Sequence, residues 1–255
     1  MGRTIQLPNS PAKRIISLVP SLTELLFDLG LDQEVVGITK FCIHPKQWFD
    51  NKPRVGGTKQ VDFNKIAALK PDLIIANKEE NQQQQVEMLM KDYTVWMSDI
   101  TTLAEALSMI LSVGELVGRS EVAEALVEEI KKRFTALLSR NIPLKKAIYL
   151  IWKDPIMAAG KGTFIDDMLQ YAGFENQLQS ELGRYPVLTL DALKELNPEY
   201  LLLSSEPYPF STKHLDYFQS VLPATKINLV DGEYFSWYGS RLKDAPGYYS
   251  NIQFA

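Results

Sequence analysis

The sequence predicts an α/β fold in which two similar lobes, each built around a parallel sheet, are joined by one long helix. The first observation is a helical pattern across residues 119–140, near the midpoint of the 255-residue chain. Its apolar positions recur with the period of a helix face, at Val122, Leu126, Ile130, Phe134 and Leu138. The second observation is an internal repeat. The third is an alternation of strand and helix patterns, which indicates parallel sheets.

The internal repeat pairs residues 62–76 with residues 189–203. In each copy an Asp or Thr caps a short helix, a proline ends it, an acidic residue follows, and a buried strand comes next. A chance resemblance between two helix–proline–strand units is the alternative, and residues 119–140 could instead form a surface helix of a single globule. The position of the long helix between the two copies favours two lobes with a cleft between them.

Four strands and four helices are expected in the first lobe, which is predicted to span residues 1–118. The strands are expected at residues 14–19, 35–39, 72–76 and 94–98, which are apolar and β-branched runs. The helices are expected at residues 21–29, 63–70, 81–91 and 103–117. Ser21 and Glu24 fit a capping box, and Asp62 caps the second helix. The segment that contains Pro45 and Pro53 is expected to be a loop.

The connecting helix is assigned to residues 119–141, with Ser120 as its cap and Asn141-Ile142-Pro143 as its end. The second lobe is predicted over residues 142–255. Its strands are expected at residues 146–152, 199–204 and 226–230. Its helices are expected at residues 163–171, 190–196 and 214–222, with Thr163 and Thr189 as caps of the first two.

Composition excludes several classes of protein. The net charge is −4 and the pI is near 5.4, and no run of Lys or Arg suggests nucleic-acid binding. No apolar run approaches the roughly 18 residues of a membrane span. The start of the chain does not resemble a signal peptide, so we expect either a cytoplasmic protein or one whose leader is missing from this sequence. The single cysteine, Cys42, excludes an internal disulfide.

Ligand-contacting residues are expected just after the strands, because ligands in parallel α/β sheets bind beyond the carboxyl ends of the strands. The densest aromatic stretch is residues 231–241, where flat rings suit a planar or bulky ligand. The alternative is a hydrophobic plug that packs the end of the chain against the second lobe. Whether Phe41 and Trp237 line a cleft or a core stays open.

The motifs of common enzymes and metal sites are absent or incomplete. Cys42 and His44 are a thiol and an imidazole two positions apart, but His214 is the one other histidine and no second cysteine exists, so no structural metal is expected. Gly160 to Thr163 precedes a predicted helix but lacks the full spacing of a phosphate-binding loop. We find no GxSxG, HExxH or GxGxxG pattern. No catalytic residue and no intrinsic cofactor are therefore predicted.

Several segments resemble a known family, the helical-backbone (class III) substrate-binding proteins of ABC importers. The similarity runs from about Arg14 to Arg241, and it is carried by residues 14–24, 55–57, 66–76, 159–163 and the aromatic loop that ends at Arg241. The family carries cobalamin, haem and iron–siderophore complexes, and its cobalamin-binding branch looks closest. The resemblance implies two α/β lobes joined by one long helix, no catalysis, and delivery of the ligand to a membrane permease.

The resemblance also implies which residues act. The residues expected to contact a corrinoid or related metal chelate are Phe41, His44, Thr58, Lys59, Asn77, Trp152, Lys161, Tyr234, Phe235, Trp237 and Arg241. Glu206 is expected to dock the permease. The protein is expected to be a monomer, periplasmic or on the cell surface if a leader has been removed. The alternatives are an intracellular metal-chelate carrier or sensor on the same scaffold, and a two-lobed transferase.

Overall fold

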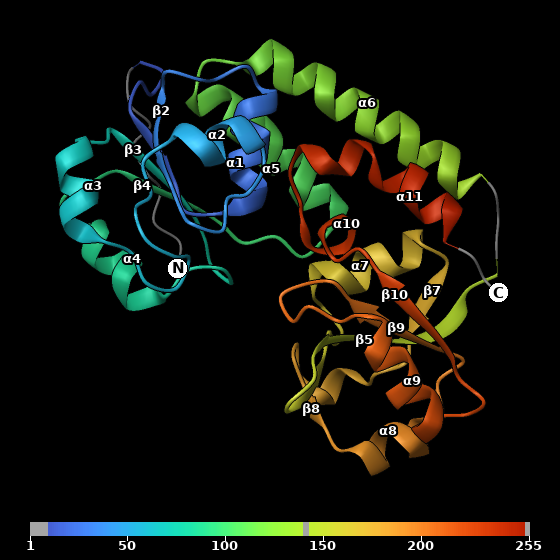
Figure 1. Cartoon of the computed structure of the whole chain (residues 1–255). Helices are drawn as coiled ribbons and strands as arrows, with labels where there is room; N and C mark the ends of the chain where they lie inside the picture. Colours follow the sequence, from blue (N-terminus) through green and yellow to red (C-terminus); the bar gives the residue numbers. More distant parts are fainter. Residues whose placement is uncertain (1–9, 140–142, 253–255) are drawn as a thin grey trace. The chain divides into compact units, whose positions relative to one another are not determined.

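The computed structural model describes residues 10–139 and 143–252. The chain divides into two compact units, each with its own sheet (Figure 1). Unit 1 comprises residues 1–100, 104–129 and 238–241, and unit 2 comprises residues 101–103, 130–237 and 242–255. Neither unit is therefore one continuous stretch of chain. The predicted end of the long helix at Arg140, and the expected boundaries at residues 141 and 142, lie outside the described residues.

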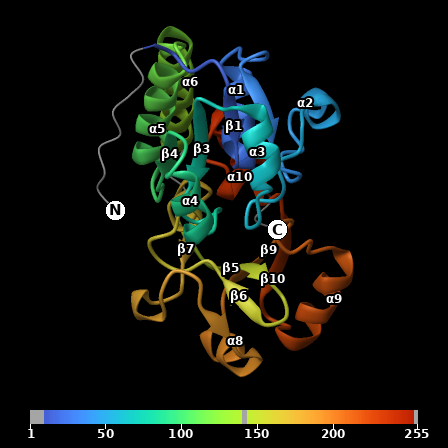
Figure 2. The ribbon, with the colours of Figure 1, turned by 90° about the vertical axis from the view of Figure 1, so that its left-hand side faces the viewer.

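Unit 1 contains a four-stranded sheet in the order β2-β1-β3-β4, and every neighbouring pair is parallel. The strands are β1 (Ile15–Ser17), β2 (Val35–Ile38), β3 (Leu73–Asn77) and β4 (Val95–Ser98). The helices are α1 (Pro20–Asp28), α2 (Lys46–Asn51), α3 (Phe63–Leu69), α4 (Gln83–Leu89) and α5 (Leu103–Leu116). Figure 2 shows β1, β3 and β4 side by side, with α5 next to β4. The four predicted strands are confirmed.

Two helix starts differ from the prediction. Val19 is the N-cap of α1 and Pro20 occupies its first turn, so Ser21 lies inside the helix and caps nothing. Proline suits this position because the first turn has no intrahelical partner for its missing N–H. The long helix α6 (Ser120–Leu138) begins at Ser120 itself, so Ser120 is not its cap. Helix α2, within the expected loop, was not predicted because it has only six residues.

The repeated helix–strand unit is present in both copies. In α3 the side chain of Asp62 accepts a hydrogen bond from the N–H of Lys65 (3.1 Å), and in α8 (Leu190–Leu196) Thr189 accepts one from Ala192 (3.1 Å). Both helices end in a left-handed residue that precedes a proline, and both lead into a fully buried five-residue strand. The left-handed residues are Lys70 (φ 47°) and Asn197 (φ 43°).

Unit 2 contains a mixed sheet in the order β10-β9-β5-β6-β8, with β7 also paired to β5. The strands are β5 (Lys145–Trp152), β6 (Ile156–Ala158), β7 (Phe174–Asn176), β8 (Val187–Leu188), β9 (Tyr200–Ser204) and β10 (Lys226–Val230). The pairs β10–β9, β9–β5 and β5–β7 are parallel, whereas the pairs β5–β6 and β6–β8 are antiparallel. The α/β class with parallel sheets is confirmed, and the antiparallel edge is an addition that the sequence did not predict.

The helices of unit 2 are α7 (Phe164–Tyr171), α8, α9 (Thr212–Val221), α10 (Glu233–Ser236) and α11 (Ala245–Asn251). Thr163 caps α7 as expected, because its side chain accepts a hydrogen bond from the N–H of Asp166. Helix α11 was not predicted. Its Tyr249 is buried and donates a hydrogen bond to the carbonyl of Tyr234 (2.6 Å), so α11 packs on α10.

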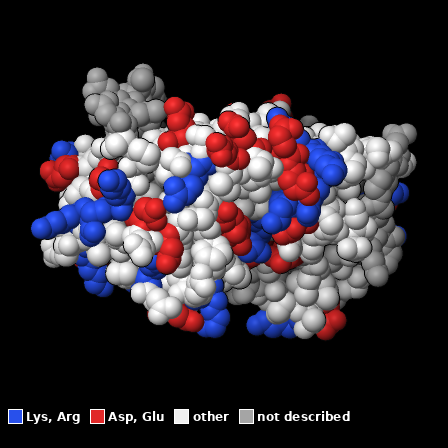
Figure 3. Space-filling model, turned by 90° about the horizontal axis from the view of Figure 1, so that it is seen from above, with Lys and Arg blue, Asp and Glu red and all other residues white. Residues whose placement is uncertain are grey.

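Helix α6 spans 19 residues, of which 120–129 belong to unit 1 and 130–138 to unit 2. Val127, Ile130 and Phe134 are buried, but Val122 and Leu138, which the periodicity assigned to the same face, are exposed. Acidic and basic side chains are interspersed on the face seen from above in Figure 3. Within residues 10–139 and 143–252, no helix is both long and apolar enough to span a membrane.

Candidate functional site

The loop after β2 presents Phe41, whose side chain is 51% exposed. The N–H of Lys40 donates to the carbonyl of Gly56 (2.8 Å), and the Lys40 ammonium lies 5.0 Å from the centre of the Phe41 ring. The ring packs over Gly57, where an added Cβ would lie 3.1 Å from the ring. His44, three residues later, is half-buried. Phe41 is therefore an exposed ring with a defined backbone position.

Thr58 and Lys59 lie on a loop that is bonded to the loop after β3, and Asn77 ends that strand. Asn81 donates to the carbonyl of Thr58 (2.9 Å), and the Lys59 ammonium donates to the carbonyl of Glu79. The Asn77 side chain is buried, accepts from the N–H groups of Glu79 (2.8 Å) and Glu80 (3.1 Å), and donates to Ser98. Asn77 thus shapes the loop, contrary to the expectation that it contacts ligand.

Trp152, at the end of β5 in unit 2, is 38% exposed. Its indole N–H donates to the carbonyl of Asp154 (3.1 Å), and its ring meets Tyr208 edge to face, with centroids 5.5 Å apart and planes at 67°. Tyr208 is half-buried and follows β9. Tyr208 was not expected in the site from the sequence, although its position after a strand was a signal that could have found it.

Polar groups of the segment from Gly160 to Thr163 already have partners within the protein. The Asp166 carboxylate accepts from the N–H of Gly162 (3.1 Å) and lies 3.6 Å from the Lys161 ammonium, and Gly160 donates to the carbonyl of Arg184 (2.7 Å). An acidic side chain therefore takes the place that an anion would need at the start of α7. Lys161 keeps 37% of its side chain exposed.

The aromatic stretch at residues 231–241 is largely core. Phe235 is fully buried against Tyr149, with ring centroids 5.2 Å apart, and Trp237 is 5% exposed. Tyr234 is half-buried and stacks on Tyr248 of α11 at 4.4 Å. The buried rings of Phe235 and Trp237 fit the alternative that this stretch is a hydrophobic plug. Their burial does not support the expectation that they contact ligand.

Two charged residues, one expected to contact the ligand and one expected to dock the permease, have hydrogen-bond partners within their own unit. In unit 1 the Arg241 guanidinium forms two hydrogen bonds to the Glu24 carboxylate, at 3.0 and 2.5 Å, and both side chains are mostly buried. In unit 2 one carboxylate oxygen of Glu206 accepts from the Ser236 hydroxyl (2.5 Å) and the Trp237 indole (3.0 Å). These bonds argue against a ligand contact by Arg241 and against permease docking by Glu206.

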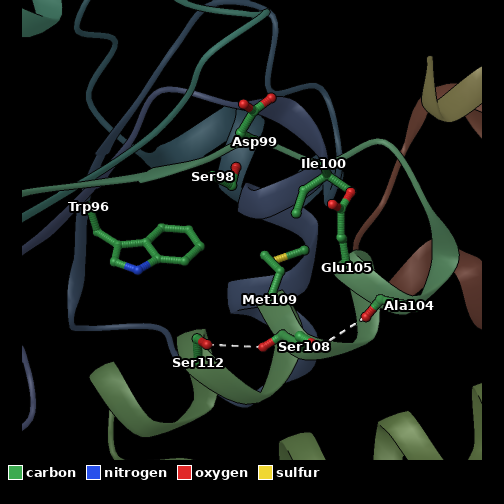
Figure 4. A pocket seen from close by; sticks show the side chains of 9 residues that line it. All are labelled: Trp96, Ser98, Asp99, Ile100, Ala104, Glu105, Ser108, Met109 and Ser112. Atoms are coloured by element: carbon green, nitrogen blue, oxygen red, sulfur yellow. Dashed lines mark hydrogen bonds between the residues drawn. The ribbon is translucent and has the colours of Figure 1, made fainter. Parts of the chain in front are cut away.

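A pocket of about 400 Å³ lies on unit 1 beside β4 and α5 (Figure 4). Trp96 and Met109 contribute its apolar wall, and the hydroxyls of Ser108 and Ser112 on its rim donate to carbonyls of their own helix. None of the residues predicted to contact ligand lines this pocket. It is therefore distinct from the predicted site.

Across the described ranges, no group of three or more His, Cys, Asp or Glu side chains could hold a metal ion. Cys42 is fully buried and lies 3.0 Å from the hydroxyl of Thr23 and 3.2 Å from that of Thr39. Burial raises the pKa of the Cys42 thiol, although hydrogen bonds from Thr23 and Thr39 oppose the shift. A neutral buried thiol is a poor metal ligand, because the thiolate is the ligating form.

Comparison with known proteins finds relatives by sequence and by structure. The chain is 28% identical over 201 residues to an uncharacterized ABC transporter substrate-binding lipoprotein of Bacillus subtilis, a match that covers 74% of this chain and 63% of that relative. It is 26% identical over 198 residues to the vitamin B12-binding protein of Vibrio cholerae, covering 76% and 71%. These relatives are binding proteins rather than enzymes, in agreement with the expectation that this chain is not an enzyme.

Solved structures share the fold. The periplasmic vitamin B12 binding protein BtuF of Vibrio cholerae matches with a TM-score of 0.83 and 22% identity, covering 96% of this chain and 99% of that one. The periplasmic heme-binding protein RhuT of Roseiflexus matches with a TM-score of 0.79 and 22% identity, covering 95% and 100%. The periplasmic binding protein family profile matches residues 15–225. The chain belongs to the periplasmic binding protein family.

Proposed function

We propose that this chain is the substrate-binding component of an ABC importer and that its ligand is a corrinoid or a related metal chelate. The observation that carries the proposal is the family match over residues 15–225, together with 26% identity to a vitamin B12-binding protein. Delivery to a membrane permease, and a location in the periplasm or on the cell surface, belong to the same proposal. The names of the relatives, which include periplasmic proteins and a lipoprotein, support that location.

Phe41 and Trp152 supply the physical support. A large planar ligand gains most from flat apolar rings that are already fixed, because an ordered side chain loses little freedom on binding. Phe41 lies after β2 and packs over Gly57, and Trp152 is the last residue of β5, with its indole bonded to the carbonyl of Asp154. Both keep more than a third of their surface exposed.

The proposed contacts are the predicted residues, other than Arg241, whose side chains remain at least partly exposed. They are Phe41, His44, Thr58, Lys59, Trp152, Lys161 and Tyr234. The remaining predicted contacts are Asn77, Phe235, Trp237 and Arg241, and their side chains are buried or paired within the protein. These four are assigned to the framework of the site.

The proposal is tested by titrating the protein with cyanocobalamin, cobinamide, haem and a ferric siderophore while tryptophan fluorescence is recorded. These ligands absorb visible light, so a bound ligand is expected to quench Trp152. Saturable quenching by a corrinoid alone supports the proposal in full, and saturation by haem or the siderophore moves the ligand within the same class. Binding of none of the four would overturn the ligand class.

Substitution of Trp152 by Ala is expected to weaken binding about tenfold, because a buried aromatic contact is typically worth more than about 1 kcal/mol. The melting temperature should change little, since the ring is partly exposed. Trp48→Phe is the matched control, because Trp48 is buried and bonded to Asp32 in unit 1 (2.9 Å). Equal loss of affinity in the control would count against a direct contact by Trp152.

A further inference from the structure

Trp152 belongs to an aromatic cluster in unit 2 that also contains Tyr208, Phe210 and His214. Tyr208 contacts Trp152 edge to face at 5.5 Å and Phe210 at 4.7 Å. The N–H of Tyr208 also reaches the carbonyl of Ile151 (3.4 Å), next to Trp152 on β5. The backbone and the ring of Tyr208 are thus both fixed beside the indole.

His214 fixes the other side of Tyr208. The imidazole is buried and meets Phe210 edge to face, with centroids 5.4 Å apart and planes at 82°. Its Nδ1 accepts a hydrogen bond from the N–H of Ser211 (2.9 Å), within the capping box of α9. In a neutral imidazole whose Nδ1 is an acceptor, Nε2 carries the proton. Nε2 lies 3.3 Å from the Tyr208 hydroxyl and can therefore donate to it.

We propose that Tyr208 and His214 are positioning residues for ligand binding: the capping histidine of α9 orients Tyr208, and Tyr208 orients the Trp152 indole that contacts the ligand. This inference rests on the proposed function, because it assumes that Trp152 is a contact. Neither residue was expected to belong to the site from the sequence.

The contribution to affinity comes from restricting the movement of the Trp152 side chain before ligand binds. An indole with 38% of its surface exposed retains alternative rotamers unless neighbours exclude them. Two neighbours exclude alternative rotamers of Trp152. The carbonyl of Asp154 accepts from the indole N–H, and the ring of Tyr208 packs edge to face against the indole. Preorganisation of this kind raises affinity by lowering the entropy lost on binding. An aromatic pair is worth about 0.5–1.5 kcal/mol, which corresponds to about a two- to tenfold change in affinity.

The arrangement also depends on the charge of His214. Protonation places a hydrogen on Nδ1, which then cannot accept from Ser211. Burial lowers the pKa of His214, and so do Lys213 on α9 and Lys153 after β5, whereas the Ser211 bond and Asp154 oppose the shift. Because this pKa lies below the usual histidine value, the imidazole is uncharged at neutral pH, and the hydrogen bond from the Ser211 N–H to its Nδ1 is intact. It is lost as the pH falls below the usual histidine value of about 6.5.

The test uses the full chain labelled with 5-fluorotryptophan, with the Trp152 fluorine resonance assigned through Trp152→Phe. Tyr208→Leu removes the ring, Tyr208→Phe keeps the ring but removes the hydroxyl, and His214→Asn keeps an acceptor for Ser211. Tyr217→Leu is the control, because Tyr217 is exposed on α9 and packs on Phe218. Affinities for cyanocobalamin, cobinamide, haem and the ferric siderophore are measured from pH 8 to pH 5.

We expect Tyr208→Leu to weaken binding of the probe that saturates the wild type by about two- to tenfold. It should also shift the Trp152 resonance in the ligand-free protein. Tyr208→Phe should recover most of the affinity, and His214→Asn should remove the loss of affinity below pH 6.5. Tyr217→Leu should change none of these quantities.

Several results would overturn the inference. Unchanged affinity and an unchanged Trp152 resonance in Tyr208→Leu would do so while leaving the proposed function intact. A wild type that binds none of cyanocobalamin, cobinamide, haem and the ferric siderophore would remove both proposals together. If Tyr208→Leu does not fold, the pH profile of His214→Asn decides, and a profile identical to that of the wild type rejects the role of His214.

Discussion

Glu206 lies just after strand β9, where parallel α/β sheets commonly present side chains to ligands or partners. Its carboxylate instead accepts hydrogen bonds from Ser236 and Trp237, some 30 residues further along the chain. The Trp237 indole N–H is a buried donor, and a buried donor requires an acceptor. Glu206 therefore ties the aromatic stretch to the end of β9.

Replacement of Glu206 by Ala is expected to lower the free energy of unfolding by about 1–3 kcal/mol, because it leaves the Trp237 N–H and the Ser236 hydroxyl without their acceptor. Urea denaturation followed by circular dichroism measures this change. Glu195→Ala, at an exposed position of α8, is the control and should stay within about 0.5 kcal/mol of the wild type. Unchanged stability in Glu206→Ala would instead favour an outward-facing role for this carboxylate.

Cys42 is expected to be unreactive in the folded protein. The side chain is fully buried, and burial raises the pKa of its thiol, so the nucleophilic thiolate is scarce near neutral pH. Ellman's reagent should therefore titrate no thiol in buffer and one thiol per chain in 6 M guanidinium chloride. Rapid reaction in buffer would mean that the loop after β2 opens readily.

The exposure of individual aromatic residues was the part of the site that the sequence predicted least well. Trp152 ends strand β5 and Trp237 follows helix α10, yet the first is partly exposed and the second is buried. The Trp237 indole donates to Glu206, and α11 covers the nearby Phe235 with Tyr248 and Tyr249. Such coverage depends on tertiary packing of a late helix, which local periodicity does not encode.

At the scale of elements, the sequence predicted well wherever a cap, an apolar run and a proline coincide. Helix α8 and strand β10 have the predicted bounds, and α3 and α7 differ only slightly. The missed elements α2, α10, β6, β7 and β8 have two to six residues, too few to show a period. Helix α11 was missed because its sequence contains proline, glycine and two tyrosines, which are poor helix formers.

The repeated unit offers a matched pair of substitutions at the helix ends. Lys70 and Asn197 both adopt left-handed backbone angles, which cost a residue with a Cβ about 1–2 kcal/mol but are tolerated better by Asn. Lys70→Gly is expected to raise the free energy of unfolding by roughly 0.5–1 kcal/mol, and Asn197→Gly by less. Thermal and urea unfolding of both variants measures the difference, and a larger gain at Asn197 would contradict this reasoning.

At the scale of the whole molecule, unit 1 is completed by residues 238–241, far from its other segments in sequence. Gly239 approaches α1 so closely that an added Cβ would lie 2.6 Å from the carbonyl oxygen of Ser21. Arg241 then pairs with Glu24, 217 positions earlier in the chain. The sequence predicted two lobes that are each continuous in sequence, on either side of the connecting helix, since the hydrophobic pattern gives no sign that the chain returns.

Breaking the Glu24–Arg241 pair is expected to destabilise unit 1. Arg241→Met should lower the free energy of unfolding by about 2–3 kcal/mol, because both side chains are mostly buried and Glu24 would be left without its cation. The double variant Glu24→Gln with Arg241→Met should recover part of that loss, and urea denaturation of all four proteins measures the coupling. Loss of ligand affinity at unchanged stability would restore Arg241 to the list of ligand contacts.

The return of residues 238–241 to unit 1 also sets an order of events during synthesis. Domains usually fold as they leave the ribosome, and the N-terminal domain folds first. Here Arg241, the partner of Glu24, is translated 217 positions after it, and residues 130–237 of unit 2 come before it. A nascent chain can therefore form most of unit 1 early, but it can complete that unit only after residues 130–237 of unit 2 have been translated.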